Sequence, residues 1–427
     1  MLVLGLGDTG LSVARWVEKQ GGMPRVADTR AAPPRAKDFA GELRTGPFNA
    51  ALLEGVDLVC VSPGLSLEEP VIRLALHRGV PVLGDVELFA WHNRGRVLAV
   101  TGTNGKTTVT SLLGHLLRTA GVNCEVAGNI GPPVLAAAMA GTPAVWALEL
   151  SSYQLETTWS LRPEAAGLLN ITDDHLDRYP GLGAYARAKA RIFEGAATQV
   201  LNRHDSLALA MARPGVRTIT FGLDSPPSAQ DFGVVDGVLH RGTLALIPAS
   251  RLRIRGGHNV ANALAACALA SVAAPLEALA AGLASFAGLP HRVELVATRR
   301  GVEWYDDSKG TNVGATVAAL NGLAKPTILI VGGEGKGQKF APLRAAVERF
   351  CRISLLIGRD APLIEKALAG LPTARCASLE AAVEQATRHA APGDAVLLSP
   401  ACASFDMFRD YKHRGEAFVA AVKALPE

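Results

Sequence analysis

Residues 97–108 read VLAVTGTNGKTT, an apolar run that breaks into a glycine-rich loop. The backbone N–H groups of such a loop surround phosphate oxygens, while its lysine supplies positive charge and its hydroxyl suits Mg²⁺. A generic phosphate-binding loop has a glycine five residues before its Gly-Lys pair. Val100 stands there, so this loop is the shorter T-G-T-N-G-K-T form. With a strand expected at Val97–Val100 and a helix at Thr108–Thr119, the stretch predicts a site for ATP or a close relative in an α/β sheet.

The size and charge of the chain limit the classes of protein to consider. At 427 residues it is long enough for about three domains, and its hydrophobic content of 49% is typical of a packed α/β protein. A net charge of +4 is too small on such a chain to indicate a nucleic-acid partner. Acidic and basic residues are interspersed, as expected for a solvated surface.

Cysteine usage and hydropathy indicate a cytoplasmic protein. The six cysteines include no C-x-x-C pair, so we expect reduced thiols rather than disulfides or a zinc site. The opening MLVLGLGDTG enters a strand and a turn directly, without the pattern of a secretion signal. The longest apolar tract, Ala261–Ala274, is too short for a membrane span and predicts a core helix. We expect no membrane partner, and we expect a monomer.

Strand and helix patterns divide the chain into three α/β units, residues 1–85, 86–288 and 289–427. Alternating strands and helices predict parallel sheets with helices on their faces, Rossmann-like in the first and third units and of ATPase type in the middle. A β-rich excursion is expected at Thr218–Ile247. The other expected strands are Leu2–Leu4, Arg25–Ala27, Asp57–Val61, Val145–Leu150, Glu303–Asp306, Thr327–Val331, Ser354–Ile357 and Ala395–Leu398. Further expected helices are Leu11–Lys19, Val71–Arg78 and Ala184–Glu194.

A second glycine motif opens the first unit. Gly5–Gly10 read GLGDTG, and Asp28 ends the next strand eighteen residues after Gly10, as in dinucleotide-binding turns, where the acid holds a ribose. A nicotinamide enzyme needs no separate ATP site, so we favour a nucleotide sugar, whose diphosphate fits the same turn. A plain βα turn is the alternative. Arg30 and the loop Ser62–Gly64, at neighbouring strand ends, favour an anion site.

Acidic side chains follow the phosphate-binding loop. Glu149 ends an apolar strand, where a buried carboxylate needs a cation or hydrogen bonds, so we expect it to serve Mg²⁺. A strand-end carboxylate at the surface is the alternative. Asp173–Asp177 read DDHLD, in which His175 would be an unusual Mg²⁺ ligand and a solvated turn is the alternative.

Loops in the second half of the chain carry amides and lysines. In GHNVAN, residues 257–262, Asn259 is either the N-cap of the alanine-rich helix or, with Asn262, one of two amides presented to a purine. The loops DDSKGTN (306–312) and GGEGKG (332–337) each place a lysine at the carboxyl end of a strand. With SPACAS (399–404) at a third strand end, they suggest convergence on an anion.

Together these motifs resemble those of the Mur ligases, the ATP-dependent amide ligases of peptidoglycan precursor synthesis. The GLGDTG, ADTR, GDVELF and LSPACAS segments are most similar to the member that adds D-glutamate to UDP-N-acetylmuramoyl-L-alanine, and the D-N-P-R signature of a diaminopimelate-adding member is absent from the sequence. The stretches shared with the family run through all three units: TGTNGKTT, ELSSYQLE, DDHLDRY, AKARIF, GGHNVANALAA, GLPHRVE, DDSKGTN, GGEGKG and LSPACASFDMF.

The resemblance implies catalytic roles for Lys106, Glu149, His175 and Lys189. It implies two Mg²⁺ ions, held by Thr107, Glu149, His175 and Lys189, with Lys189 as its carbamate. It implies ATP contacts from Gly102, Thr103, Asn104, Gly105, Lys106, Thr107, Thr108, Asn259, Asn262, Arg292, Asp307 and Lys309. It implies UDP-sugar contacts from Gly7, Asp8, Thr9, Asp28, Thr29, Arg30, Ser62, Gly64 and Asn129. It implies D-glutamate contacts from Lys309, Thr311, Lys336, Ser404 and Tyr411.

The implied reaction has two steps. The substrate carboxylate attacks the γ-phosphate of ATP to give an acyl phosphate, and the amine of D-glutamate then displaces phosphate, with the third unit closing over the site. A folylpolyglutamate synthase-like ligase is the nearest alternative, but it needs no diphosphate turn in its first unit. A nicotinamide dehydrogenase leaves the phosphate-binding loop idle, and a non-catalytic nucleotide-binding module leaves Glu149, His175 and Lys189 unexplained.

Overall fold

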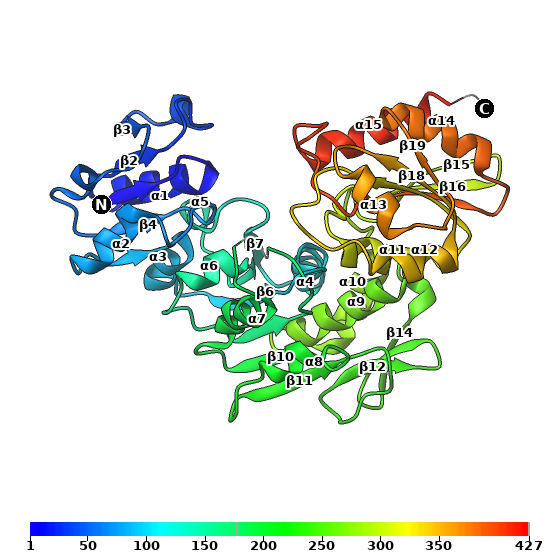
Figure 1. The fold of residues 1–427 in the computed structure, drawn as a ribbon. Helices are drawn as coiled ribbons and strands as arrows, with labels where there is room; N and C mark the ends of the chain where they lie inside the picture. The colour runs from blue at the N-terminus through cyan, green and yellow to red at the C-terminus, as the bar shows by residue number, and fades with distance from the viewer. Residues whose placement is uncertain (176–177, 426–427) are drawn as a thin grey trace.

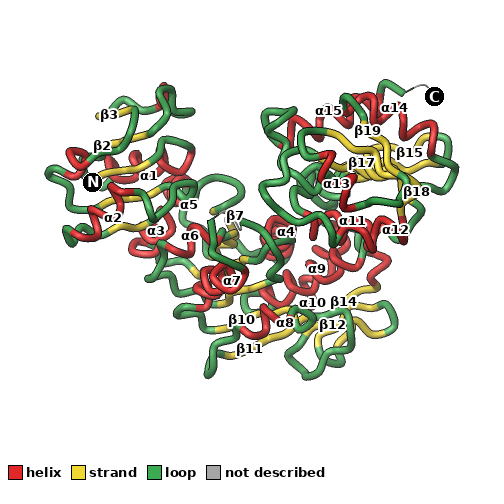
Figure 2. Tube along the Cα trace, in the orientation of Figure 1, coloured by secondary structure: helices red, strands yellow, loops and turns green. Residues whose placement is uncertain are grey.

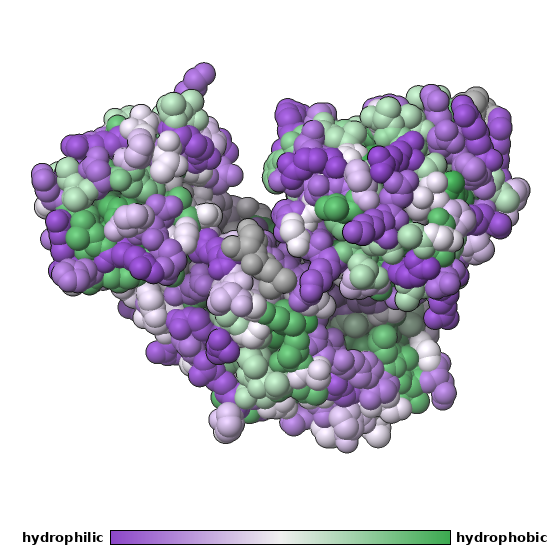
Figure 3. Space-filling view, in the orientation of Figure 1, coloured by the Kyte–Doolittle hydropathy of each residue, from purple (hydrophilic) through white to green (hydrophobic). Residues whose placement is uncertain are grey.

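The structure is a computed structural model that describes residues 1–175 and 178–425 (Figure 1). Three β-sheets follow one another along the chain, each with its own helices. The first and third lie apart on either side of the second, and the space-filling surface is hollowed between them (Figure 3). The predicted α/β class with three sheets is confirmed. Leu176 and Asp177 of the DDHLD segment lie outside the described residues.

The first sheet is parallel, in the order β3-β2-β1-β4-β5. A side chain at Gly10 would overlap the carbonyl of Gly5, so only glycine lets the chain turn straight from β1 into α1, which begins before the predicted Leu11. Strands β3 and β5 escaped prediction because β3 is largely exposed and β5 is very short. The strands are β1 (Leu2–Leu4), β2 (Arg25–Asp28), β3 (Glu42–Thr45), β4 (Val59–Val61) and β5 (Val82–Leu83), and the helices are α1 (Asp8–Lys19), α2 (Pro70–His77) and α3 (Asp85–His92).

The middle sheet has the order β14-β13-β12-β11-β10-β9-β6-β8-β7. It is parallel from β7 to β12 and ends in antiparallel β13 and β14, which confirms the β-rich excursion (Figure 2). Its strands are β6 (Arg96–Thr101), β7 (Cys124–Gly128), β8 (Val145–Glu149), β9 (Ala165–Leu168), β10 (Thr198–Asn202), β11 (Arg217–Phe221), β12 (Phe232–Val235), β13 (Val238–Arg241) and β14 (Leu244–Pro248). Its helices are α4 (Lys106–Thr119), α5 (Val134–Ala140), α6 (Ser152–Glu156), α7 (Leu182–Ala190), α8 (Ser206–Ala210), α9 (Gly257–Ala270) and α10 (Leu276–Ser285).

Two hydrophobic clusters hold the middle sheet. Helices α4, α9 and α10 pack together over one face, where their leucines and the alanines Ala263–Ala270 of α9 are buried. On the other face, α5 contacts α1 and α3, so one continuous core includes side chains of the first and middle sheets, such as Val3 and Trp146. The first unit is therefore attached to the middle unit by apolar packing.

The third sheet has the order β15-β16-β20-β17-β18-β19 and is parallel except for β15. Edge strands β15 and β19 escaped prediction, because their residues are mostly half-buried or exposed and show no continuous apolar run. The strands are β15 (Glu294–Arg299), β16 (Val302–Asp306), β17 (Thr327–Gly332), β18 (Cys351–Ile357), β19 (Thr373–Arg375) and β20 (Ala395–Leu398). The helices are α11 (Val313–Leu323), α12 (Leu343–Phe350), α13 (Ala361–Ala367), α14 (Leu379–His389) and α15 (Tyr411–Lys423).

Several predicted helix ends were wrong. Helix α4 begins at Lys106, because Gly105 takes the left-handed conformation (φ 84°) that starts it. Helix α7 ends at Ala190 and continues as a short 3₁₀ turn. Asn259 is not an N-cap: Gly256, with φ 93°, holds that position, and the alanine-rich helix ends at Ala270.

None of the helices within residues 1–175 and 178–425 combines the length and apolarity needed to cross a lipid bilayer.

Candidate active site

The phosphate-binding loop has two positions that only glycine can fill. Gly102 (φ 152°) packs against Leu169, and a side chain at Gly105 (φ 84°) would come within 2.5 Å of Oδ1 of Asn262. The Nζ atom of Lys106 folds back to donate to the carbonyls of Gly102 and Thr103, both at 2.9 Å. The loop therefore encloses the lysine that was predicted to meet phosphate.

The loop after β9 braces the phosphate-binding loop. Asn170 accepts the N–H of Asn104 at 2.8 Å and donates its amide to the Asn104 carbonyl at 3.0 Å. The N–H of Thr172 donates to Oγ1 of Thr103 at 3.0 Å. These contacts hold the backbone N–H groups of the loop in a defined shape.

Glu149 lies at the end of β8 and is only 1% exposed, so the surface alternative is wrong. Its Oε1 accepts a hydrogen bond from Nδ2 of Asn129 at 2.7 Å, and its Oε2 is buried without a partner. A buried carboxylate oxygen without a donor is costly, and a cation would satisfy it. The Glu149 side chain thus fits a hard metal ion such as Mg²⁺.

Lys189 is buried, also at 1% exposure. Its Nζ donates to the Gly102 carbonyl at 2.8 Å and lies 4.5 Å from the centre of the Tyr185 ring. Burial, together with the neighbouring charge of Lys106, lowers the pKa of Lys189 well below its usual value. Compared with an exposed lysine, the amine is therefore shifted toward its neutral, nucleophilic form.

His175 is half-buried and takes a left-handed backbone conformation (φ 53°). Burial lowers the pKa of its imidazole, with smaller contributions in the same direction from Lys336 and Lys189. Its Nε2 lies 3.7 Å from Oδ2 of Asp174, while Lys336 of the third unit lies 4.0 Å from Oδ1 of the same carboxylate. His175 is therefore a neutral ring near Lys189, at the boundary of two units.

A cavity of about 290 Å³ lies between the middle and third units. Of the predicted ATP residues, it is lined by Asn104, Gly105, Thr108, Asn259, Asn262, Arg292, Asp307 and Lys309. The sequence did not single out Asn202, Phe221 and His258, which line it too. His258 could have been noticed beside Asn259, whereas Phe221 carries no signal beyond its strand. Burial lowers the pKa of His258 to about 4, so its ring is neutral.

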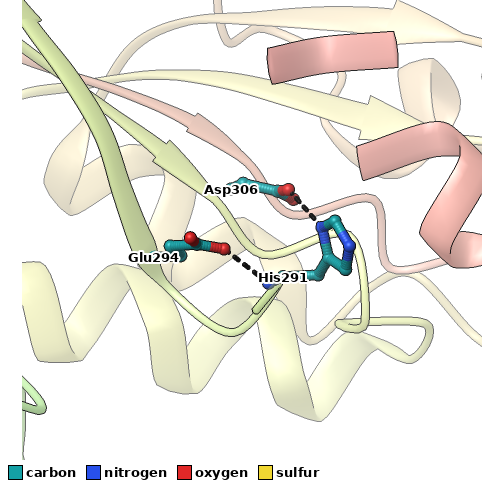
Figure 4. Close-up of side chains that lie close together, drawn as sticks. All are labelled: His291, Glu294 and Asp306. Atoms are coloured by element: carbon teal, nitrogen blue, oxygen red, sulfur yellow. Dashed lines mark hydrogen bonds and ion pairs between the residues drawn. The ribbon is translucent and has the colours of Figure 1, made fainter. Parts of the chain in front are cut away.

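The segment that presents Arg292 to this cavity is strained. His291 (φ 62°) and Val293 (φ 49°) flank it, and a positive φ is costly for a β-branched residue. Nδ1 of His291 pairs with Oδ2 of Asp306 at 2.6 Å, and the backbone N–H of His291 donates to Oε2 of Glu294 at 2.9 Å (Figure 4). These three side chains come close enough to suggest a metal site. In this structure they hydrogen-bond within the cluster, and these bonds brace the strained segment.

Two cations, Arg292 and Lys309, line this cavity, and Lys106 lies near enough to act on Lys309. Burial lowers the pKa of Lys309 to about 8, and Arg292 and Lys106 add to the effect. Burial lowers the pKa of Lys106 itself. Burial also raises the pKa of Asp307 to about 7, although Ser399 donates to its Oδ2 at 2.7 Å. Cations held so close together that they lower the pKa of Lys309 suit a polyanion such as a triphosphate.

The predicted D-glutamate residues do not form one contact network. Nζ of Lys309 lies 3.9 Å from the centre of the Tyr411 ring, and the N–H of Thr311 donates to the Lys309 carbonyl at 2.8 Å. Lys336 instead faces the middle unit, and Ser404 is buried in its own loop. The structure thus brings together three of these five residues.

Arg414 was not predicted, although it lies one helical turn after Tyr411. It is buried, donates from Nε and Nη2 to the side chain and carbonyl of Ser308, and donates from Nη1 to the carbonyls of Cys402 and Ala403. It therefore ties the DDSKGTN loop to the SPACAS loop.

A second cavity, of about 420 Å³, lies at the carboxyl edge of the first sheet. Gln154 from the middle unit lines it and was not predicted. Both oxygens of Asp28 are engaged by Arg30 and by the N–H of Leu6, and the side-chain bond from Arg30 helps hold the pKa of Asp28 at about 2. All nine predicted UDP-sugar residues line this cavity: Gly7, Asp8, Thr9, Asp28, Thr29, Arg30, Ser62, Gly64 and Asn129.

Three family descriptions match successive parts of the chain. Residues 1–84 match the Mur ligase MurD-like N-terminal domain, residues 100–270 the Mur ligase middle domain, and residues 291–402 the Mur ligase glutamate ligase domain. The chain is 53% identical to the UDP-N-acetylmuramoylalanine–D-glutamate ligase of Thiobacillus denitrificans, over 100% of this chain and 96% of that protein. It is also 53% identical to the enzyme of the same name from Methylobacillus flagellatus, over 100% and 97%.

Solved structures share the fold at low sequence identity. The UDP-N-acetylmuramate-alanine ligase of Thermotoga maritima superposes with a TM-score of 0.65 and 19% identity, covering 99% of each chain. The folylpolyglutamate synthase of Mycobacterium tuberculosis gives 0.61 and 16%, covering 80% of this chain and 95% of that one. The fold alone therefore does not separate these two kinds of ligase.

Proposed function

This chain belongs to the Mur ligase family, and on that premise we propose that it joins D-glutamate to UDP-N-acetylmuramoyl-L-alanine with ATP, in peptidoglycan precursor synthesis. The observation that carries the chemistry is the cluster around Gly102, whose carbonyl accepts from both Lys106 and Lys189. The buried oxygen of Glu149 that lacks a partner supports a metal-assisted reaction of a triphosphate in the same unit.

We assign one substrate to each unit. Residues 1–85 would bind the UDP-sugar, residues 86–288 ATP, and residues 289–427 D-glutamate while closing over ATP. The two cavities support this division, because one is lined mainly by the first unit, with Gly128, Asn129 and Gln154 from the middle unit, and the other lies between the second and third. The first cavity also favours this function over a folylpolyglutamate-type ligase, which needs no diphosphate site.

The reaction would proceed in two displacements. An oxygen of the substrate carboxylate forms a bond to the γ-phosphorus, and the bond from that phosphorus to the bridging oxygen of ADP breaks. The amine of D-glutamate then attacks the acyl carbon, loses a proton, and expels phosphate. Negative charge on the transferred phosphoryl group would be stabilised electrostatically by the cations placed around it, which are Lys106, Arg292 and Lys309.

Two Mg²⁺ sites fit the donor atoms present. Thr107 and the free oxygen of Glu149 would hold one ion, and His175 and carbamylated Lys189 the other. Mg²⁺, when bound, supplies positive charge that neutralises phosphate oxygens. Carbamylation is supported by the buried, neutral-favouring amine of Lys189, because only a neutral amine adds to CO₂.

The hydrogen bonds of Asp28 argue against a nicotinamide dehydrogenase. In a dinucleotide site this carboxylate must be free to accept from ribose hydroxyls. Here Arg30 donates to both of its oxygens. Asp28 would therefore serve the UDP-sugar by orienting Arg30 toward the diphosphate.

We place the enzyme in the cytoplasm as a monomer. Its six cysteines are all free, as expected in a reducing compartment.

The test is phosphate release from ATP, measured with each substrate omitted in turn. Release should require both UDP-N-acetylmuramoyl-L-alanine and D-glutamate. Turnover with a folate and L-glutamate, or hydride transfer to NAD, would refute the assignment.

A further inference from the structure

A hydrogen bond between two side-chain amides joins the middle and third units. Nδ2 of Asn312 donates to Oδ1 of Asn104, in the phosphate-binding loop, at 3.0 Å. Asn312 also caps α11, since its Oδ1 accepts the N–H of Ala315 at 2.9 Å. One end of this amide therefore serves its own unit and the other end serves the neighbouring unit.

The connection extends into both units. Oε1 of Gln338 accepts the N–H of Val313, the first residue of α11, at 3.0 Å, and Nε2 of Gln338 donates to the carbonyl of Ala401 at 2.6 Å. Ala401 belongs to the SPACAS loop. On the other side, Asn104 is held through its N–H by Asn170, at 2.8 Å. Hydrogen bonds through side-chain amides thus run from the SPACAS loop to the phosphate-binding loop.

The approach of the two units at this point is close. A side chain at Gly314, in the first turn of α11, would lie 3.3 Å from Nδ2 of Asn104 and 3.4 Å from Oγ1 of Thr172. The first turn of α11 therefore rests on the phosphate-binding loop, and the Asn312 contact is part of a packed junction.

We propose that Asn312 is a positioning residue, which holds the loop carrying Lys309 and Thr311 against the phosphate-binding loop. Gln338 links the same segment to the SPACAS loop. Asn312 acts through Asn104 rather than on reacting atoms. Small misplacements of groups around a phosphoryl transfer are costly in rate. This role deepens the proposed function. It rests on that function for the identity of the amino acid acceptor, but its effect on nucleotide binding does not depend on it.

The variant Asn312→Ser separates the two jobs of this side chain. Serine still caps a helix, whereas its hydroxyl is too short to reach Asn104. Loss of one neutral hydrogen bond corresponds to about 3- to 10-fold in an equilibrium constant. We expect ADP to bind more weakly by that factor in calorimetry and kcat to fall, while the KM for the UDP-sugar is unchanged because neither Asn104 nor Asn312 lines that cavity.

A matched control removes a cap elsewhere in the same unit. Ser378 caps α14, with its Oγ accepting the N–H of Ala381 at 3.2 Å, and α14 packs on β18 and α15. Ser378→Ala should lower Tm but leave ADP affinity unchanged. The double variant Asn104→Ser/Asn312→Ser should bind ADP no more weakly than the weaker single variant, because the two amides share one contact.

Wild-type ADP affinity and kcat in Asn312→Ser would overturn the proposal, and so would additive losses in the double variant. ADP binding needs no amino acid acceptor. If the amino acid acceptor is assigned wrongly, the phosphate-release assay will therefore show it, and the ADP-binding result will still stand.

Discussion

Lys189 and Glu149 are ionisable groups buried in places where carrying a charge is costly. In the described part of the chain, their hydrogen bonds go to a backbone carbonyl and to an amide rather than to an opposite charge. A buried charge without a counter-charge either changes protonation or awaits a charged ligand. Under the proposed function, the amine of Lys189 would add to CO₂ and the carboxylate of Glu149 would bind a cation.

Replacing Lys189 with alanine should remove nearly all ligase activity while the protein still folds. The alanine lacks the amine that would become a carbamate, and a small carboxylate in the vacated space could replace it in part. Phosphate release by Lys189→Ala, with and without acetate or formate, measures this. The matched control is Lys366→Ala, an exposed lysine on α13. Near-normal activity in unrescued Lys189→Ala would make Lys189 a structural residue only.

Asp85 allows a test of buried charge by pH. It is fully buried at the start of α3, and burial raises its pKa from 3.8 to about 6. The folded state keeps this proton up to about pH 6, whereas the unfolded chain loses it above pH 3.8. The stability of the fold is therefore full below pH 3.8 and falls as the pH rises through 6. The displacement corresponds to about 3 kcal/mol at pH 8.

Asp85→Asn should therefore stabilise the protein at pH 8 by up to about 3 kcal/mol. The gain should shrink to nothing near pH 4, where the carboxyl group is neutral in both states. Urea unfolding of both proteins across this range measures the difference. A pH-independent difference would show that Asp85 is neutral, or charged, throughout.

Helix α3 is the element that connects the first sheet to the middle one. Glu87, on this helix, is buried and accepts the N–H groups of Trp159 at 2.6 Å and Ser160 at 2.9 Å, both from the loop after α6. Its other oxygen accepts from Nε1 of Trp91 at 2.8 Å. A single carboxylate thus satisfies three donors and fixes α3 on the middle unit.

Glu87→Gln should destabilise the protein by about 1–3 kcal/mol, because the new NH₂ group must face N–H donors in a buried site. The control Glu125→Gln changes an exposed glutamate on β7 and should alter stability by less than about 0.5 kcal/mol. Urea unfolding of both variants provides the comparison. Equal effects would mean that α3 is held by its apolar side alone.

On the scale of the whole molecule, the first and third units lie on opposite sides of the middle unit (Figure 1). The first is attached through a shared apolar core, and the third through polar contacts such as Asn312 with Asn104 and Lys336 with Asp174. Polar contacts exchange readily with water, whereas a shared core does not. Closure should therefore occur at the third unit.

Lys106→Ala should abolish ligation and leave binding of UDP-N-acetylmuramoyl-L-alanine intact, since Lys106 does not line the cavity that holds the predicted UDP-sugar residues. Calorimetry with the UDP-sugar and a phosphate-release assay measure the two properties separately. Hydrogen exchange should show protection of Gly7–Thr9 by the UDP-sugar in both proteins, with NADH as the negative control. Loss of UDP-sugar binding in Lys106→Ala would contradict the division of sites.

The local chemistry of this protein could be predicted from its sequence. The loops at Gly5–Gly10 and Gly102–Lys106 are contiguous, and the steric demands of their glycines act over a few residues. Long apolar strands such as β6 and β17 were predicted for the same reason. Edge strands β3 and β15 were missed because half-exposed strands depend on a neighbour that the local pattern does not contain.

What only the tertiary structure decided is which distant side chains meet and how deeply they are buried. Lys189 meets the carbonyl of Gly102 across 87 positions of the sequence, and Asn312 meets Asn104 across 208. Burial then lowers the pKa of Lys189, and pairing with Arg30 occupies Asp28. Hydrogen bonds and desolvation act over a few ångströms in space, so the sequence can supply the groups while only the fold decides which of them interact.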